Sequence, residues 1–258
     1  MKTMKIISWN VNGLRAVERK GFAQWLEEAN PDVLCVQETK LQPEQVPEGL
    51  REFGDYQLEV FSAQRRGYSG VAMWTRLEPT AVQKGLGIEK FDVEGRVLRV
   101  DFGGFLFYGI YFPNGGASQE RLKYKLEFYE AVLEQLRELN PREKKIVVCG
   151  DVNVAHKPID LAEPGHYEAV SGFLPEERAW VDRLLEAGFC DAFRMFDESG
   201  GNYTWWDYRL RARVRNLGWR LDYFFVSEAM KNDVVSCKIH AEVMGSDHCP
   251  IELEIKVP

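Results

Sequence analysis

The segment Lys144-Lys145-Ile146-Val147-Val148-Cys149-Gly150-Asp151-Val152-Asn153 is the part of the sequence that most constrains the fold. Its apolar run, followed by Gly150, predicts a short strand that is buried on both faces and ends abruptly. Asp151 and Asn153 lie two positions apart, so in an extended chain their side chains point the same way. A carboxylate and an amide at the end of a core strand suit the binding of a water molecule and a charged oxygen, although Asp and Asn also open ordinary turns.

The composition is that of a folded globular protein. The chain has 258 residues, of which 45% are hydrophobic and 28% charged, which fits one large domain or two small ones. The net charge of −7 means that a nucleic-acid partner would need a local basic patch to attract it. Five scattered cysteines without paired or zinc-type spacing predict reduced core thiols and a cytoplasmic protein. No apolar stretch resembles a signal peptide or a membrane span, so we expect no membrane association.

Apolar segments and helical patterns alternate along the chain. A helix is expected from Asn12 or Gly13 to Asn30-Pro31, a second from Ser118 and a third from Pro175 to Gly188. A short helix is expected near Pro43 and Pro47. The segments predicted to be strands are 5–10, 32–37, 56–61, 70–74, 96–102, 105–112, 146–151, 221–226, 234–240 and 251–255.

The mixture of strand types predicts the fold class. Strands of parallel-sheet character lie beside alternating ones, which indicates a layered α/β protein with mixed strands in more than one sheet. No Gly-rich loop joins the first strand to its helix, so a doubly wound fold is not expected. There is no linker, charge block or repeat, and we expect one domain over residues 1–258.

Polar residues recur where the predicted strands end. Asp222 interrupts an apolar strand, where an unpaired carboxylate costs several kcal/mol. Asp247 precedes His248, one of only four histidines, and a nearby acid would orient the imidazole and hold it protonated. Glu38 on its own would be an ordinary solvated strand end. The full set of such polar residues is Asn10, Glu38, Tyr111, Asn114, Asp151, Asn153, Asp222, Asp247 and His248. A site so rich in oxygen donors suits Mg²⁺ or Mn²⁺ better than Zn²⁺ and indicates phosphate-ester hydrolysis.

Six motifs in this order resemble the exonuclease III family of apurinic/apyrimidinic (AP) endonucleases, within the endonuclease/exonuclease/phosphatase superfamily. They are Ser8-Trp9-Asn10-Val11-Asn12-Gly13-Leu14-Arg15, Gln37-Glu38-Thr39-Lys40, Tyr111-Phe112-Pro113-Asn114, Gly150-Asp151-Val152-Asn153, Gly218-Trp219-Arg220-Leu221-Asp222-Tyr223 and Gly245-Ser246-Asp247-His248-Cys249-Pro250. The resemblance implies a four-layer α/β sandwich, in which helices flank two packed mixed sheets. It also implies a monomeric, Mg²⁺-dependent enzyme of base excision repair. This enzyme would cut double-stranded DNA 5′ to abasic sites, with some 3′-end trimming or 3′-5′ exonuclease activity.

The resemblance also implies roles for individual residues. Glu38 would be the principal Mg²⁺ ligand, with Mn²⁺ as a substitute ion. The other candidate metal contacts are Asn10, Asp151, Asn153, Asp247 and His248. Asp151 would activate the attacking water, Asn153 and Tyr111 would donate to the phosphate or assist the leaving group, and Asp222 would keep His248 cationic to stabilise the transition state. Asn12 stands where some relatives carry Asp, which leaves open whether a second metal binds.

The segment 205–220 is rich in arginine and aromatic residues and is the candidate DNA contact. Arginines alternate with aromatic residues in this segment, a pattern that suits binding of phosphates and bases. By resemblance, Arg209 would insert into the duplex, and Trp205, Trp219 and Leu221 would form a pocket for a flipped-out abasic sugar. The further candidate contacts are Asn114, Arg121, Lys125, Arg211, Arg213, Arg215 and Arg220.

Three alternatives remain open at this stage. The first is that the enzyme also nicks at an unexcised base such as uracil, because the pocket sequence does not show whether a base is excluded. A phosphatase or phosphodiesterase acting on a small molecule or lipid is a second alternative, and the arginine-rich segment argues against it. A DNA-binding scaffold without catalysis would lack one or more of the metal or base positions, and none is missing.

Overall fold

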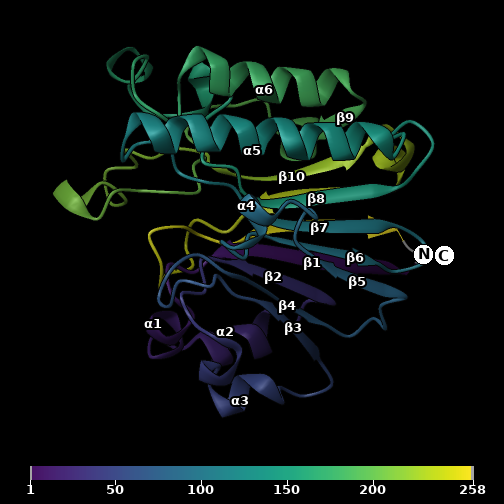
Figure 1. Ribbon diagram of the computed structural model, residues 1–258. Helices are drawn as coiled ribbons and strands as arrows, with labels where there is room; N and C mark the ends of the chain where they lie inside the picture. Colours follow the sequence, from purple (N-terminus) through teal and green to yellow (C-terminus); the bar gives the residue numbers. More distant parts are fainter. Residues whose placement is uncertain (1, 257–258) are drawn as a thin grey trace.

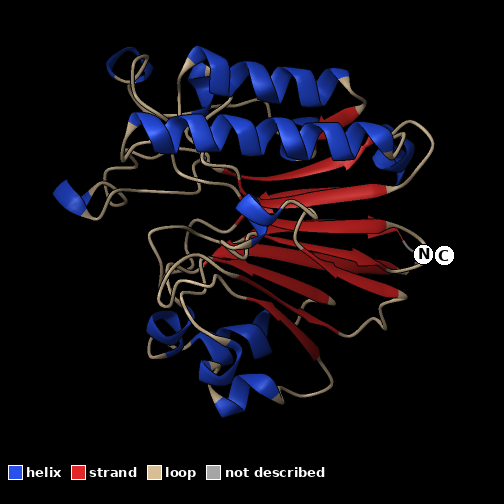
Figure 2. Ribbon diagram, viewed as in Figure 1, coloured by secondary structure: helices blue, strands red, loops and turns tan. Residues whose placement is uncertain are grey.

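Two six-stranded mixed sheets pack face to face between two helical layers in the computed structural model, which describes residues 2–256 (Figures 1 and 2). The first sheet has the order β11 (Val234–Ile239), β12 (Ile251–Lys256), β1 (Thr3–Asn10), β2 (Val33–Gln37), β4 (Val71–Thr75), β3 (Gln57–Phe61). The second has the order β5 (Ala81–Lys84), β6 (Val97–Asp101), β7 (Leu106–Tyr111), β8 (Ile146–Asp151), β10 (Asp222–Ser227), β9 (Phe189–Asp191). Each sheet contains one parallel pair, β1 with β2 and β7 with β8.

Helices cover the outer face of each sheet. On the first sheet lie α1 (Leu14–Glu18), α2 (Phe22–Ala29) and α3 (Glu48–Arg51); on the second lie α5 (Gln119–Glu138) and α6 (Pro175–Glu186) (Figure 1). The hydroxyl of Ser118 caps α5 by accepting a hydrogen bond from the Arg121 backbone N–H, 3.2 Å away. The remaining short elements are η1 (Pro43–Gln45), α4 (Glu89–Asp92), η2 (Pro158–Asp160), η3 (Pro164–His166), η4 (Phe193–Met195), η5 (Arg209–Arg211) and η6 (Glu228–Asp233).

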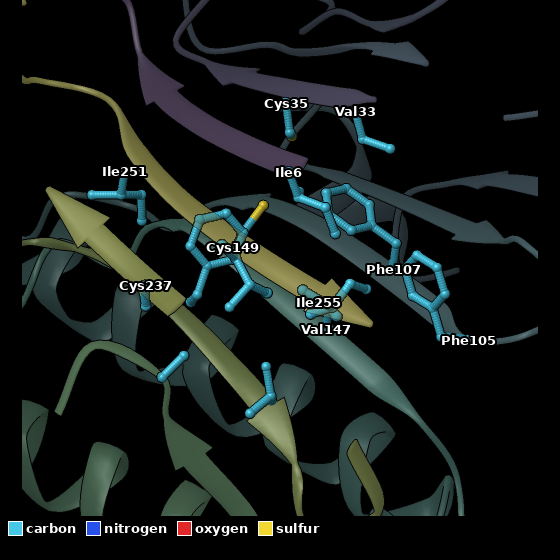
Figure 3. Packing of buried hydrophobic residues seen from close by; sticks show 14 of the residues in the cluster. Ile6, Val33, Cys35, Phe105, Phe107, Val147, Cys149, Cys237, Ile251 and Ile255 are labelled. Carbon is cyan, nitrogen blue, oxygen red and sulfur yellow. The ribbon is translucent and has the colours of Figure 1, made fainter. Parts of the chain in front are cut away.

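The apolar layer between the two sheets is continuous. Ile6 and Val33 of the first sheet pack with Phe107, Val147 and their neighbours of the second (Figure 3). Burial of this apolar surface holds the two sheets together and fixes how their ends are aligned.

Two glycines permit close backbone approaches. A Cβ at Gly109 of β7 would overlap the Cys35 Sγ of β2, so the two sheets approach each other more closely here than any side chain would allow. Gly150 has φ +137°, and a Cβ there would overlap the Ile110 carbonyl oxygen. Gly150 therefore sets the path of β8 directly before Asp151.

The predicted fold class is confirmed, and so are the ten predicted strands, to within a residue or two at their ends. The single helix expected after the first strand is wrong: Gly21, with φ +94°, separates α1 from α2. The short elements β5, β9 and α4 were not predicted, because each has too few residues to show a periodic pattern. Among residues 2–256, no helix is long and apolar enough to cross a bilayer.

The topology brings the polar strand ends to one edge of the sandwich. Strands β1 and β2 are parallel, so their carboxyl ends meet, and β7 and β8 do the same in the other sheet. Strand β10 runs antiparallel to β8, and its first residue, Asp222, lies opposite Asp151. His248 lies just before β12, which pairs antiparallel with β1. Both sheets therefore contribute to one site.

Candidate active site

Asp151 lies at the floor of a cavity of about 770 Å³ at this edge. Its Oδ1 accepts the Asn153 backbone N–H at 2.9 Å, and its Oδ2 accepts the side-chain amides of Asn10 and Asn153 at 2.9 and 3.0 Å. The carboxyl is buried, and burial raises its pKa to about 7; the Asp222 charge adds to this, while His248 and the hydrogen bonds oppose it. Asp151 can therefore exchange a proton near neutral pH.

His248 and Asp222 form a buried hydrogen-bonded pair, with 2.8 Å between the imidazole Nδ1 and the Asp222 Oδ2. The other ring nitrogen, Nε2, lies 3.9 Å from the Asp151 Oδ2. Burial by itself lowers the pKa of His248, but the charges of Asp222 and Asp151 outweigh it and raise the pKa to about 10. The imidazole is therefore a cation that points its free N–H toward Asp151. The Asp222 Oδ1 is buried without a hydrogen-bond partner.

The carboxylate of Glu38 lies on the other side of Asp151. The Asn10 Nδ2 bridges the two acids, at 3.1 Å from the Glu38 Oε2 and 2.9 Å from the Asp151 Oδ2. The Lys40 ammonium lies 2.9 Å from the Glu38 Oε1 and also donates to the Asn12 Oδ1. Glu38 and Asn12 adopt left-handed backbone, with φ +58° and +47°, which is uncommon for residues other than glycine and aims both side chains into the site.

Asn12 also connects this group to Asp247. Its Nδ2 donates to the Asp247 Oδ1 at 2.9 Å, and Trp205 Nε1 donates to the Asp247 Oδ2 at 3.2 Å. Burial favours the neutral acid, but His248 and these two donors outweigh it and lower the pKa of Asp247. Asp247 is thus an ionised carboxylate at the cavity wall.

Three further polar residues, Tyr111, Asn114 and Asn153, line the cavity. Burial, strengthened by the charge of Glu38, raises the pKa of Tyr111 well above its ordinary range, so the phenol stays protonated. The Asn153 Oδ1 accepts from the Asn114 Nδ2 at 3.0 Å, and Asn153 has left-handed backbone with φ +57°. Tyr111, Asn114 and Asn153 all face the cavity.

An aromatic pocket continues from the polar floor. Trp205, Trp219 and Leu221, which the resemblance assigns to a sugar pocket, line this part of the cavity. Trp205 and Trp219 meet edge to face with ring centroids 6.3 Å apart. The sequence missed the segment after η3, which completes the wall; Tyr167 packs against Trp219 at 4.8 Å between centroids. The cavity-lining residues that were not predicted are Ala162, Glu163, Tyr167, Val170, Ser171, Gly172, Asp207, Ala212 and Leu217. The only sequence signal for the segment after η3 was an aromatic residue in a polar loop.

The prediction that Lys125 contacts DNA is wrong. Its ammonium is buried between α5 and α6, 2.6 Å from the Glu177 Oε1 and 2.7 Å from the Asn153 carbonyl oxygen. Arg220 was wrongly placed in the DNA-binding segment for the same reason. Its guanidinium is 1% exposed and pairs with Asp160 and Asp191 at 2.8 and 2.7 Å. Neither side chain can reach a phosphate on the surface.

The remaining cations differ in accessibility. The Arg209 side chain is 88% exposed at the cavity rim, Arg211 is exposed on the same turn, and Arg215 also lines the rim. Arg121 is half-buried and pairs with Glu94 at 2.7 Å. The prediction that Arg213 contacts DNA is wrong, because its guanidinium donates to backbone carbonyl groups and is not free to bind a phosphate.

Metal-binding side chains are grouped at the floor of the cavity. Asp151, Asp222 and His248 each offer a ligand atom, and these atoms lie within 4.8 Å of one another. The His248 Nδ1 is already engaged with Asp222, so a metal ion bound there would have to displace the imidazole proton. Glu38 and Asp151 form an alternative, oxygen-only set around the Asn10 amide. Lys40, whose ammonium neutralises Glu38, is a site residue that the sequence reasoning overlooked although it lies in the second motif.

Comparison with known proteins identifies the family. The profile of the Endonuclease/Exonuclease/phosphatase family matches residues 7–248. The chain belongs to this family. Among family members, an exodeoxyribonuclease of Bacillus subtilis is 45% identical over 259 residues, covering 98% of this chain and 100% of the relative. The DNA repair nuclease APEX1 of Danio rerio is 42% identical over 257 residues, covering 98% of this chain and 83% of the relative.

Solved structures of the family agree with the fold. An AP endonuclease from Archaeoglobus fulgidus superposes with a TM-score of 0.90 at 31% identity, covering 98% of this chain and 100% of that one. A 3′ phosphatase, NExo, from Neisseria, bound to a product DNA hairpin, superposes with a TM-score of 0.89 at 31% identity and with the same coverage.

Proposed function

We propose that this protein is an AP endonuclease and exodeoxyribonuclease of DNA repair that hydrolyses the phosphodiester 5′ to an abasic site in duplex DNA and also trims 3′ ends. The observation that carries the proposal is the arrangement of Asp151, Asp222 and His248 at the floor of a cavity with aromatic walls and an arginine-bearing rim. The similarity to DNA-repair nucleases over nearly the whole chain supports it.

Asp151 is the base for the attacking water. Its pKa of about 7 is suited to accepting a proton at neutral pH. The three hydrogen bonds from Asn10 and Asn153 fix the orientation of the Asp151 carboxylate, so a water molecule bound to it also has a fixed position. The departing 3′ oxygen receives a proton either from Tyr111, whose phenol is protonated, or from water at the cavity mouth.

His248 stabilises the charge that develops on the phosphate. Its cationic imidazole is buried and held by Asp222, so little reorganisation is needed when negative charge builds up on the phosphoryl oxygens. The Asn114 amide faces the same space and keeps one N–H free to donate to a phosphoryl oxygen, whereas both N–H groups of the Asn153 amide are engaged, by the Asp151 Oδ2 and the Phe112 carbonyl oxygen. These groups favour the transition state over the ground state because the transition state carries more charge.

The side chains fit a hard divalent cation, and we propose Mg²⁺, with Mn²⁺ as a substitute. Carboxylate oxygens of Glu38 and Asp151 converge on the single Asn10 amide, so a small oxygen-binding ion would find both acids within reach. Asn10 and Asp247 would complete the set of ligands. When bound, Mg²⁺ supplies Lewis-acid stabilisation of the phosphate oxygens and the leaving oxygen.

Duplex DNA is the proposed partner. The exposed Arg209 and Arg211 attract the backbone at the rim, and the pocket of Trp205, Trp219 and Leu221 receives the flipped-out sugar. We further propose that the protein acts as a monomer in the reducing cytoplasm, consistent with its five free cysteines.

A gel assay tests the function. Labelled duplexes that carry a tetrahydrofuran abasic analogue, a deoxyuridine or no lesion are incubated with Mg²⁺ or with EDTA. We expect one Mg²⁺-dependent cut 5′ to the analogue, leaving a 3′ hydroxyl that a polymerase extends directly. Cutting of the deoxyuridine duplex would extend the substrate range to unexcised bases. The proposal fails if incision is insensitive to EDTA or equally fast on undamaged DNA, or if His248→Ala cuts as well as the wild type.

A further inference from the structure

The side chain of Arg213 connects the cavity rim, which carries Arg209, Arg211 and Arg215, to the segment that carries Asp247 and His248. Its Nη1 donates to the Ser246 carbonyl oxygen at 3.1 Å, and its Nη2 donates to the carbonyl oxygens of Ala241 at 2.9 Å and Val243 at 2.6 Å. The guanidinium also lies over the Trp206 ring, with its Cζ 4.6 Å from the ring centroid. One side chain thus gathers three carbonyl groups of a loop that otherwise lacks regular structure.

The loop held by Arg213 leads directly into the reaction centre. Ser246, whose carbonyl oxygen accepts from Arg213, donates its hydroxyl to the Asn10 carbonyl oxygen at 2.8 Å. The same hydroxyl oxygen accepts the His248 backbone N–H at 3.3 Å. Ser246 is therefore fixed from one side by Arg213 and from the other by β1, and it sets the backbone from which His248 projects.

The other end of the connection lies at the cavity rim. Arg213 follows η5 (Arg209–Arg211), and the cavity is lined on this side by Asp207, Arg209, Ala212 and Arg215. The segment around η5 protrudes from the body of the molecule at the left of Figure 1. Backbone contacts reinforce the link, since the Trp206 N–H donates to the Asp247 carbonyl oxygen at 3.0 Å.

We propose that Arg213 is a positioning residue that couples engagement of the rim by DNA to the placement of His248 and Asp247. The inference rests on the proposed nuclease function, and it assigns to Arg213 an effect on turnover, not on substrate affinity. The neighbouring exposed arginines, Arg209 and Arg211, act differently, because they raise the affinity for DNA by binding its phosphates. A displacement of reacting groups by about 1 Å costs up to about a hundredfold in rate, so loss of this link is measurable.

Arg211 provides the matched control, because it lies two residues away on the same turn and is exposed. We compare Arg213→Gln with Arg211→Gln in steady-state incision of the tetrahydrofuran duplex at several salt concentrations. For Arg213→Gln we expect kcat to fall by about tenfold or more with little change in KM. For Arg211→Gln we expect the loss in KM, together with a shallower salt dependence. Arg213→Lys, which keeps a cation that donates hydrogen bonds, should recover part of kcat.

A readout independent of activity separates positioning from mere stability. The His248 Nδ1 proton, shared with Asp222, should give a downfield imidazole signal in the proton NMR spectrum of the free protein. We expect this signal to broaden or shift in Arg213→Gln and not in Arg211→Gln, at a temperature where both variants remain folded by circular dichroism. An unchanged kcat with an unchanged signal overturns the inference, and so does a pure KM effect, which would make Arg213 a DNA contact. If the wild type itself shows no EDTA-sensitive incision, the proposed function fails instead, while the NMR comparison still tests the positioning.

Discussion

Replacement of Asp222 by Asn tests whether the charge on His248 drives the reaction. The pKa of His248 is about 10, compared with an ordinary value of 6.5, and this difference corresponds to about 5 kcal/mol. Because burial alone lowers the pKa, the increase comes from carboxylates, of which Asp222 is the nearest, at 2.8 Å. If Asp222→Asn removes about half of this energy, the pKa falls to about 8. The cationic fraction then changes little at pH 7 but falls about tenfold at pH 9.

The assay is a pH profile of kcat on the tetrahydrofuran duplex between pH 6 and pH 9.5. For the variant we expect the decline of the rate on the alkaline side to begin about two pH units lower than in the wild type. The His156–Asp182 pair supplies a matched control, because its Nε2 and Oδ1 are 2.7 Å apart, close to the 2.8 Å between His248 and Asp222, but neither residue lines the cavity. Asp182→Asn should leave the profile unchanged. A variant rate reduced by the same factor at pH 7 and pH 9 would refute the role of the His248 charge.

Three further changes test the energetics of the site and the core. Asp151→Asn should abolish incision. It should also become more stable relative to the wild type as pH rises from 5 to 9, because the wild-type acid has a folded-state pKa of about 7, above the ordinary 3.8, and its ionisation destabilises the native state. A difference in melting temperature between variant and wild type that is the same at both pH values would contradict this. Lys125→Met leaves Glu177 buried without its ion-pair partner and should cost about 3–5 kcal/mol in urea unfolding, with the salt dependence of DNA binding unchanged; a shallower salt slope would restore Lys125 as a DNA contact. Gly109→Ala inserts a methyl group against the Cys35 Sγ and should lower the free energy of unfolding by about 1–3 kcal/mol, whereas a neutral effect would mean that the sheets can move apart at that point.

The sequence predicted the fold and the polar floor of the site because both follow from local patterns. Apolar runs that end in Asn10, Glu38, Tyr111 and Asp151 place these side chains at strand ends, and parallel neighbours bring such ends together. Asp222 was singled out because an acid within an apolar strand requires a partner. The structure supplies that partner in His248, 26 residues further along the chain.

The cations were assigned less well, because composition does not show which way a side chain faces. Lys125 occupies the face of α5 that also carries Phe128, Tyr129 and Val132, so helical spacing alone would have placed it inward. Trp219 and Leu221 share the cavity face, and alternation along the chain therefore directs Arg220 to the opposite, buried side. The partners of these cations are distant in sequence, and only the folded chain brings them together.

The chain crosses from the first sheet to the second and then returns, because β11 and β12 join the sheet that contains β1. His248 precedes β12, whereas Asp222 and Asp151 belong to the other sheet. The hydrogen bond between His248 and Asp222 therefore joins the two sheets, and it can form only when β12 is paired with β1. A chain in which β12 has not docked beside β1 lacks the His248–Asp222 pair, so hydrolysis requires that both sheets be complete.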